Sequence, residues 1–256
     1  MPTAKNTPDT RMPTTRVRDA TGTGLLRKSY QTRLYDLFKE YDERLNIRVG
    51  RLMDRTTEQQ GMLKEFMEKI DAVESAVMKA KTPRIIDEHI TRSFKRGKEV
   101  AVANPRLTRQ SIVIPSRLSR TDNLALEDMK IRNFNLINDD TIKKTLLRVM
   151  TEDIRQGKGT NEIAKDIQDN ILDIGKTRSK MIARTEIAFS YNSAIAKTYQ
   201  DADIEKWQWL SAMGETTCQE CESRHGNVYE WDDEQPPIHP NCLCTIYPVV
   251  DKEFKP

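Results

Sequence analysis

The residues of this sequence that could bind a metal gather in one short segment near its C-terminal end. Cys218 and Cys221 form a C-x2-C pair, and His239, Cys242 and Cys244 follow further along the chain. Thiolates and imidazoles are the ligands that tetrahedral Zn²⁺ prefers, and a hairpin can bring two close pairs together. The pattern predicts a closed, structural zinc site that uses Cys218, Cys221 and two of the three later residues.

Two questions about this segment stay open at the level of the sequence. His225 is a sixth possible ligand, so the residue types do not fix the ligand set. The four cysteines could also form two disulfide bonds. However, the first 25 residues lack the apolar run of a secretory signal, so we expect a reducing compartment that favours zinc. A catalytic zinc is disfavoured, because the deaminase pattern and H-E-x-x-H are both missing.

Other catalytic patterns are also missing from the sequence. It contains no Walker A run, no G-x-G-x-x-G and no G-x-S-x-G. Asp232, Asp233 and Glu234 could be imagined as a two-metal nuclease centre, but three consecutive acids point in different directions and are typical of a solvated turn. Arg184 and Glu186 lie two apart on a predicted helix, so we expect them to bridge to neighbouring elements. The sequence favours a protein that is not an enzyme.

Charge is distributed unevenly along the chain, although the net charge is only +3. Residues 1–35 and 82–120 are rich in Lys and Arg, whereas residues 201–256 are acidic. A basic front predicts contact with nucleic acid or an acidic surface, and the alternative is that the charges serve only solubility. The mean hydropathy is −0.71, so we expect a soluble protein. The candidate DNA contacts are Lys95, Arg96, Lys98, Arg106, Arg109, Arg117 and Arg120.

The first half of the chain reads as an arm followed by helices. Residues 1–23 have almost no large apolar side chains, which predicts an arm that is disordered until it meets a partner. Apolar residues recur every three or four positions over 26–52 and again over 63–77, which predicts helices. These could form an antiparallel hairpin that turns near Gly61, or one long helix that pairs with another chain. Pro83 is expected to open a third helix.

The second half predicts further helices and then a small sheet. The segment SIVIP, residues 111–115, is a short β-type run at a domain boundary. Two helices are expected across 123–156, a third with Thr160 as its N-cap, and a fourth over about 176–200. Three β-rich runs predict an antiparallel sheet with Trp207, Trp209 and Trp231 in its core. They are KWQWLSAM (206–213), NVYEW (227–231) and CTIYPVV (244–250).

The predicted fold class is therefore α+β, with a helix-rich N-terminal region and a helical and β-sheet domain that ends in a zinc-stapled hairpin. The expected divisions are a basic arm (1–23), a helical region with a basic linker (24–118) and a C-terminal domain with the Cys/His site (119–256).

Several segments, read together, resemble the phage Mu F-like minor head protein family, whose members are also called head-morphogenesis proteins. They are GTNEIAKDI, IARTEIAFSYNSAIAKTY, KWQWLSAMGETTCQEC and PPIHPNCLC, and the similarity covers about residues 120–250. The most specific pieces are Ala183-Arg184-Thr185-Glu186 with Asn192 downstream, and His239-Pro240-Asn241-Cys242-x-Cys244. Leu243 departs from the family, which often has a basic residue between the last two cysteines.

The resemblance implies a structural protein of a tailed phage, present in few copies. It would bind the portal protein inside the capsid, assist head morphogenesis, and handle the packaged DNA during packaging and ejection. Scaffold or major capsid protein are further expected partners, and no membrane is expected while the protein is in the capsid. We expect it at the portal vertex of the virion, and in the host cytoplasm during assembly. The alternatives are a zinc-containing nuclease and a DNA-binding regulator, of which the regulator would show sequence preference.

Overall fold

The computed structural model describes residues 19–53, 59–109, 111–212 and 217–250, without the side chains at 46–53, 59–63, 109 and 160. The chain forms two compact units that interleave along the sequence. One unit contains residues 88–129, those from Ala183 onward and the described residues up to Arg27; the other contains 28–87 and 130–182. The expected division at residues 23 and 118 stays a prediction. Of the predicted arm, residues 1–18 lie outside the described residues.

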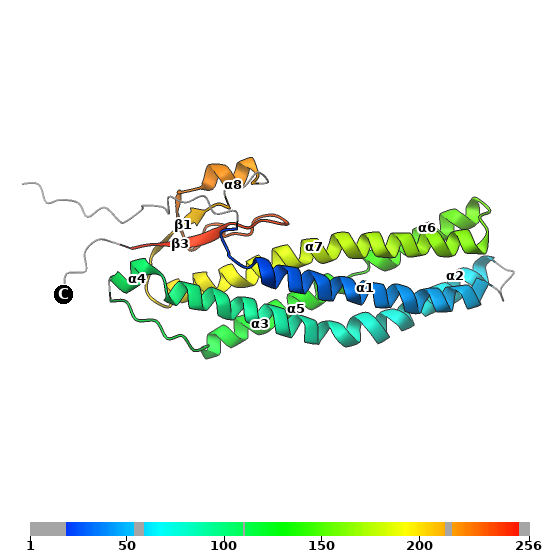
Figure 1. Ribbon diagram of the computed structural model, residues 1–256, viewed down its shortest axis with the longest axis horizontal. Coiled ribbons are helices and arrows are strands. Elements are labelled where there is room, and N and C mark those ends of the chain that lie inside the picture. The colour runs from blue at the N-terminus through cyan, green and yellow to red at the C-terminus, as the bar shows by residue number, and fades with distance from the viewer. Residues whose placement is uncertain (1–18, 54–58, 110, 213–216, 251–256) are drawn as a thin grey trace, which may run out of the picture. The chain divides into compact units, whose positions relative to one another are not determined.

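The second unit is built from helices. It contains most of α1 (Gly24–Met53), then α2 (Gln59–Val73), the π-helix η1 (Glu74–Lys79), the start of α3 (Ala80–Val102), the end of α5 (Arg120–Ile137), α6 (Thr141–Arg155) and the first part of α7 (Thr160–Gln200) (Figure 1). The predicted stripe of the first helix is confirmed: its buried residues are Tyr30, Leu34, Leu37, Tyr41 and Leu45.

The chain reverses between α1 and α3, as the hairpin alternative expects, although Gly61 itself does not lie in the turn. Lys81 of α3 reaches back to Glu40 of α1, with 2.5 Å between Nζ and Oε2, so the chain reverses between them. Gly61 lies inside α2. Pro83 does not open a helix but lies inside α3. The π-helix η1 lies immediately before α3. Its wider turn accommodates the loss of the hydrogen bond that a proline removes from a helix interior.

The two helices predicted over 160–200 are one continuous helix, α7. Gly175 lies inside this helix, and a Cβ at its position would lie 2.6 Å from the Cβ of Phe38 on α1. The glycine therefore permits a close approach between α7 and α1 within this unit. Thr160 is the first helical residue rather than the N-cap. Gly159 precedes it, and its N–H donates to the Glu162 carboxylate at 3.0 Å, as in half of a capping box.

The first unit places a three-stranded sheet against the end of α7. Its strands are β1 (Lys206–Leu210), β2 (Val228–Glu230) and β3 (Thr245–Val249), antiparallel in the order β2-β1-β3. The short helices α4 (Pro105–Arg109) and α8 (Gln219–Arg224) complete the unit. The α+β prediction is confirmed. Trp207 and Trp209 of β1 are fully buried in one core with Tyr191 and Tyr199 of α7, whereas Trp231 is only partly buried and packs against that core.

Two sequence predictions in this unit are wrong. Residues 111–115 form no strand in the described structure: Ile112 and Ile114 are half-buried against the sheet core and Val113 is exposed, but the segment pairs with no strand. Residues 19–23, assigned to the disordered arm, form a turn that is hydrogen-bonded to Arg27. Residues 111–115 stay unpaired because an extended segment becomes a strand only when a free strand edge lies beside it.

Candidate metal centre

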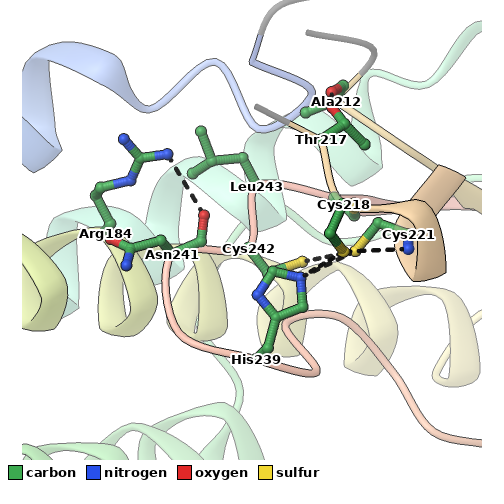
Figure 2. A pocket seen from close by; sticks show the side chains of 10 residues that line it. Arg184, Ala212, Thr217, Cys218, Cys221, His239, Asn241, Cys242 and Leu243 are labelled. Atoms are coloured by element: carbon green, nitrogen blue, oxygen red, sulfur yellow. Dashed lines mark hydrogen bonds between the residues drawn. The ribbon is translucent and has the colours of Figure 1, made fainter. Parts of the chain in front are cut away.

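Four ligand atoms from two segments, residues 218–221 and 239–242, converge in one cluster (Figure 2). The Nε2 atom of His239 lies 3.2 Å from the Sγ atoms of both Cys218 and Cys221. The Sγ atoms of Cys221 and Cys242 are 3.7 Å apart. Two thiolates bound to one tetrahedral Zn²⁺ with bonds of about 2.3 Å lie about 3.8 Å apart. The Cys221 and Cys242 separation therefore suits a shared metal, and all four cysteines are free thiols in this structure.

The C-x2-C half of the cluster is shaped by the start of α8. Cys218 is the N-cap of this helix, and its Sγ accepts a hydrogen bond from the N–H of Cys221 at 3.4 Å. This N–H lowers the pKa of the Cys218 thiol. The hydroxyl of Ser211, just after β1, donates to the carbonyl of Cys221. The sulfur atoms of this half therefore face the later cysteines.

The second half of the cluster is held by α7. The hydroxyl of Thr185 accepts a hydrogen bond from the N–H of Asn241 at 3.0 Å. The amide of Asn192 donates to the carbonyl of Cys244 at 2.9 Å and accepts from the hydroxyl of Thr245 at 2.6 Å. Thr185 and Asn192 are seven residues apart and so share one face of α7. Sequence reasoning gave them no role, although this spacing on a helix was a usable signal.

The thiols of the cluster differ in their ease of ionisation. A hydrogen bond from Cys242 lowers the pKa of the Cys244 thiol, and the same contact raises the pKa of Cys242. Burial raises the pKa of Cys221. One sulfur in each half, Cys218 and Cys244, is thus poised to become a thiolate, and a bound cation would deprotonate the others.

The five predicted ligands are brought together, and the sixth candidate is not. Within the described residues the ligand atoms form two groups of three that share Cys221: one contains Cys218 and His239, and the other contains Cys242 and Cys244. His225 instead accepts a hydrogen bond from the N–H of Ser211 at its Nδ1, 3.1 Å away. The Cys/His cluster can therefore hold a metal ion, as its sequence pattern predicted.

The acidic run after β2 forms a turn, as expected. The carboxylate of Asp233 accepts from the N–H of Glu230 at 2.8 Å, and that of Glu234 pairs with Arg224 at 2.9 Å. None of the three consecutive acids belongs to a potential metal cluster among the described residues.

Two of the candidate DNA contacts are corrected by the fold. Lys98 is buried and its Nζ lies 2.5 Å from Asp122 Oδ2. Arg106 is buried, donates to the carbonyl of Pro248 at 2.7 Å, and stacks on Tyr247 at 4.5 Å from the ring centre. Both cations are buried in contacts within the first unit and are therefore not available to bind DNA. The side chain of Arg109 lies outside the description, and the remaining candidates, Lys95, Arg96, Arg117 and Arg120, are exposed.

Comparison with known proteins finds a match over the segment that builds this cluster. Residues 144–247 match the family described as "Phage Mu protein F like protein". This segment is phage Mu F-like. The predicted resemblance is confirmed over these residues.

A curated relative is similar over part of its length. An uncharacterized protein of Methanocaldococcus jannaschii is 32% identical over 108 residues, which are 41% of this chain and 17% of that relative. The chain thus spans less than a fifth of the relative that it matches. No solved structure matches the chain. Among the described helices, none combines the length and apolar character needed to cross a bilayer.

Proposed function

We propose that this protein is a structural minor head protein of a tailed phage, bound to the portal protein inside the capsid. The observation that carries the proposal is the phage Mu F-like match over residues 144–247, which includes α7, the sheet and the Cys/His cluster. In this role the protein assists head morphogenesis and the packaging and ejection of the genome. It acts without catalysis, at the portal vertex, alongside scaffold or major capsid protein.

The Cys/His cluster has the donor set of a structural zinc site. Four thiols and one imidazole are borderline-soft ligands, and the 3.7 Å separation of the Cys221 and Cys242 sulfur atoms suits tetrahedral coordination. Cys218, Cys221 and two of His239, Cys242 and Cys244 would hold the ion. Zinc there would link the start of α8 to the segment before β3. A sheet of three short strands gains stability from such a link.

The exposed basic residues of the first unit support a non-specific contact with the packaged DNA. Lys95 and Arg96 lie on α3, Arg120 is the first residue of α5, and Arg117 lies in the segment before it. Contacts of this kind neutralise phosphates, release counterions and carry no sequence information. A protein that handles a whole genome must bind DNA of any base sequence, as phosphate contacts allow.

Co-expression with the portal protein of the same phage tests the proposal. A stable complex with fewer copies of this chain than portal subunits, counted after size exclusion, supports a minor head protein. If the chain elutes alone even when scaffold and major capsid protein are also present, the portal assignment is wrong. Magnesium-dependent DNA cleavage that Asp232→Asn and Asp233→Asn abolish would instead identify a nuclease. Sequence-selective DNA binding would identify a regulator.

A further inference from the structure

One face of α7 supports the Cys242–Cys244 loop without contributing a metal ligand. We propose that Thr185 and Asn192 are positioning residues that hold this half of the site ready for a metal ion, and that Arg184 balances the negative charge of the metal–thiolate cluster. The proposal rests on the zinc site proposed above. It gives a role to the Ala183-Arg184-Thr185-Glu186 and Asn192 motif, which the expected structural function leaves unexplained.

The second half of the site is fixed by side chains of α7. Thr185 and Asn192 make three hydrogen bonds to the backbone and side chain of residues 241–245. Asn192 is almost completely buried, so water cannot replace its contacts with Cys244 and Thr245. The ligand atoms form two groups of three around Cys221. A four-coordinate site therefore combines ligands of both halves around Cys221, and α7 holds the second half in place.

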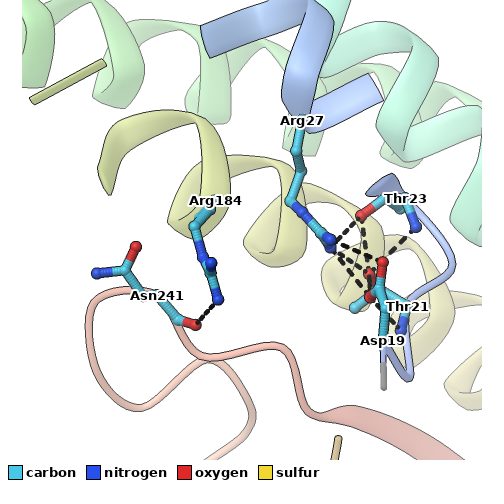
Figure 3. Close-up of polar contacts among 6 residues, drawn as sticks. All are labelled: Asp19, Thr21, Thr23, Arg27, Arg184 and Asn241. Atoms are coloured by element: carbon cyan, nitrogen blue, oxygen red, sulfur yellow. Dashed lines mark hydrogen bonds and ion pairs between the residues drawn. The ribbon is translucent and has the colours of Figure 1, made fainter. Parts of the chain in front are cut away.

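Arg184 brings a positive charge to the same part of α7 as Thr185. Its guanidinium is half-buried and donates to the carbonyl of Asn241 at 3.4 Å, and its Nε has no hydrogen-bond partner among the described residues. Figure 3 shows the neighbouring Arg27, whose Nη atoms bind both carboxylate oxygens of Asp19 at 3.0 and 2.7 Å. Burial and the charge of Arg27 lower the pKa of Arg184, and the charge of Asp19 partly opposes them. Asp19 is paired with Arg27, whereas Arg184 makes no ion pair within the part of the chain that the structure describes.

The Cys/His cluster is the anion that suits this cation. Arg184 lines the same cavity, of about 40 Å³, as the side chains of Cys218, Cys221, Cys242 and Cys244. A divalent ion bound by three or four thiolates carries net negative charge. An arginine beside the cluster stabilises that charge, and outer residues of this kind typically change metal affinity by about 10- to 100-fold.

Cobalt(II) binding to the full-length protein tests the inference. The absorption bands of tetrahedral cobalt report the coordination, and competition with a chelator gives the affinity. We expect Thr185→Val and Asn192→Leu each to weaken binding by about 10- to 100-fold, whereas Thr185→Ser, which keeps the accepting hydroxyl, restores it. Arg184→Gln should weaken binding and Arg184→Lys, which keeps the charge, should retain most of it.

The matched control is Thr198→Val on the same helix. Thr198 is as buried as Asn192, but its hydroxyl donates to the carbonyl of Ala194 within α7, so this variant should bind cobalt like the wild type. Equal weakening by Thr198→Val and Thr185→Val would show a general effect on the helix and overturn the inference. Unchanged affinity in Thr185→Val and Asn192→Leu would also overturn it.

Different cobalt-binding results would contradict the role of Arg184 and the zinc site itself. If Arg184→Lys binds as weakly as Arg184→Gln, the charge-balancing role is wrong. If the wild type shows no tetrahedral cobalt bands, or Cys218→Ser shows the same bands and affinity, the zinc site itself is wrong and the inference falls with it.

Discussion

The ammonium group of Lys98 lies 2.5 Å from the carboxylate of Asp122, and both side chains are almost completely buried. Asp122 also accepts a hydrogen bond from the N–H of Ser119 at 2.7 Å, while the hydroxyl of Ser119 accepts from the N–H of Asp122 at 3.0 Å. This reciprocal pair is a capping box at the start of α5. Lys98 thus links α3 to the N-terminus of α5 within the first unit.

Removal of the Lys98 charge should destabilise the protein strongly. Lys98→Met leaves the Asp122 carboxylate buried without its cation, which typically costs about 3–5 kcal/mol. Urea denaturation followed by circular dichroism measures the loss. Lys95→Met, at the exposed position three residues earlier, is the control and should change the free energy of unfolding by less than about 0.5 kcal/mol. Equal losses in the two variants would contradict the structural role of the ion pair.

The same pair predicts a dependence of stability on pH. Burial by itself raises the pKa of Asp122, but the hydrogen bonds from Lys98 and Ser119 outweigh it and hold this pKa below its ordinary 3.8. A carboxylate with a lowered folded-state pKa contributes stability above its unfolded-state pKa. That contribution is lost as the pH falls below about 4 and through the folded value. Asp122→Asn should therefore flatten the acid limb of the unfolding free energy, measured from pH 5 to 2. An unchanged limb would contradict the lowered pKa.

Gly97 marks a place where α3 and α7 touch through their backbones. A Cβ at this position would lie 2.2 Å from the carbonyl oxygen of Tyr191 and 3.0 Å from the Cβ of Ala194. The backbone cannot yield cheaply, so Gly97→Ala should cost at least about 1–3 kcal/mol of stability. At Gly159 the nearest atom to an added Cβ is 3.7 Å away, so Gly159→Ala should lose only the small preference for glycine over alanine at an N-cap, and less stability than Gly97→Ala. A thermal melt of both variants decides the matter.

Loss of the metal should loosen the sheet and leave the helices intact. Cys218→Ser removes one ligand, and the nearby Trp207 and Trp209 report the packing of the sheet core. We expect the near-ultraviolet circular dichroism of the tryptophans to fall while the far-ultraviolet helix signal stays. Treatment of the wild type with a strong chelator should have the same effect. Tryptophan signals that do not change in either experiment would count against a structural metal.

The proposed DNA contact predicts a steep dependence on salt. Replacement of Lys95, Arg96, Arg117 and Arg120 by Gln should weaken binding to all duplex sequences alike. Each lost phosphate contact should lower the slope of log K against log salt by about 0.9. Fluorescence anisotropy with two unrelated duplexes at several salt concentrations measures both effects. A slope that is the same in the variant and the wild type would exclude these four residues from the contact.

Much of the architecture follows from local patterns in the sequence. The three- and four-residue spacing of Tyr30, Leu34 and Leu37 specifies a buried helix face, because the α-helix has 3.6 residues per turn. The change to short aromatic and β-branched runs near residue 206 specifies the strands. The spacing of the cysteines and His239 alone specifies a cluster, because a knuckle and a nearby loop can meet at little entropic cost.

Only the tertiary structure decided what depends on neighbours distant in the sequence. Lys98 and Arg106 look like surface cations, but Asp122 and the Pro248 carbonyl bind them inside the unit. Residues 111–115 have the alternation of a strand and lack a partner edge. Gly175 looks like a helix break, yet Phe38 packs where a Cβ would lie. Whether a polar group is buried, a strand is paired or a glycine is required is set by long-range packing, and residue type and local spacing carry no record of that packing.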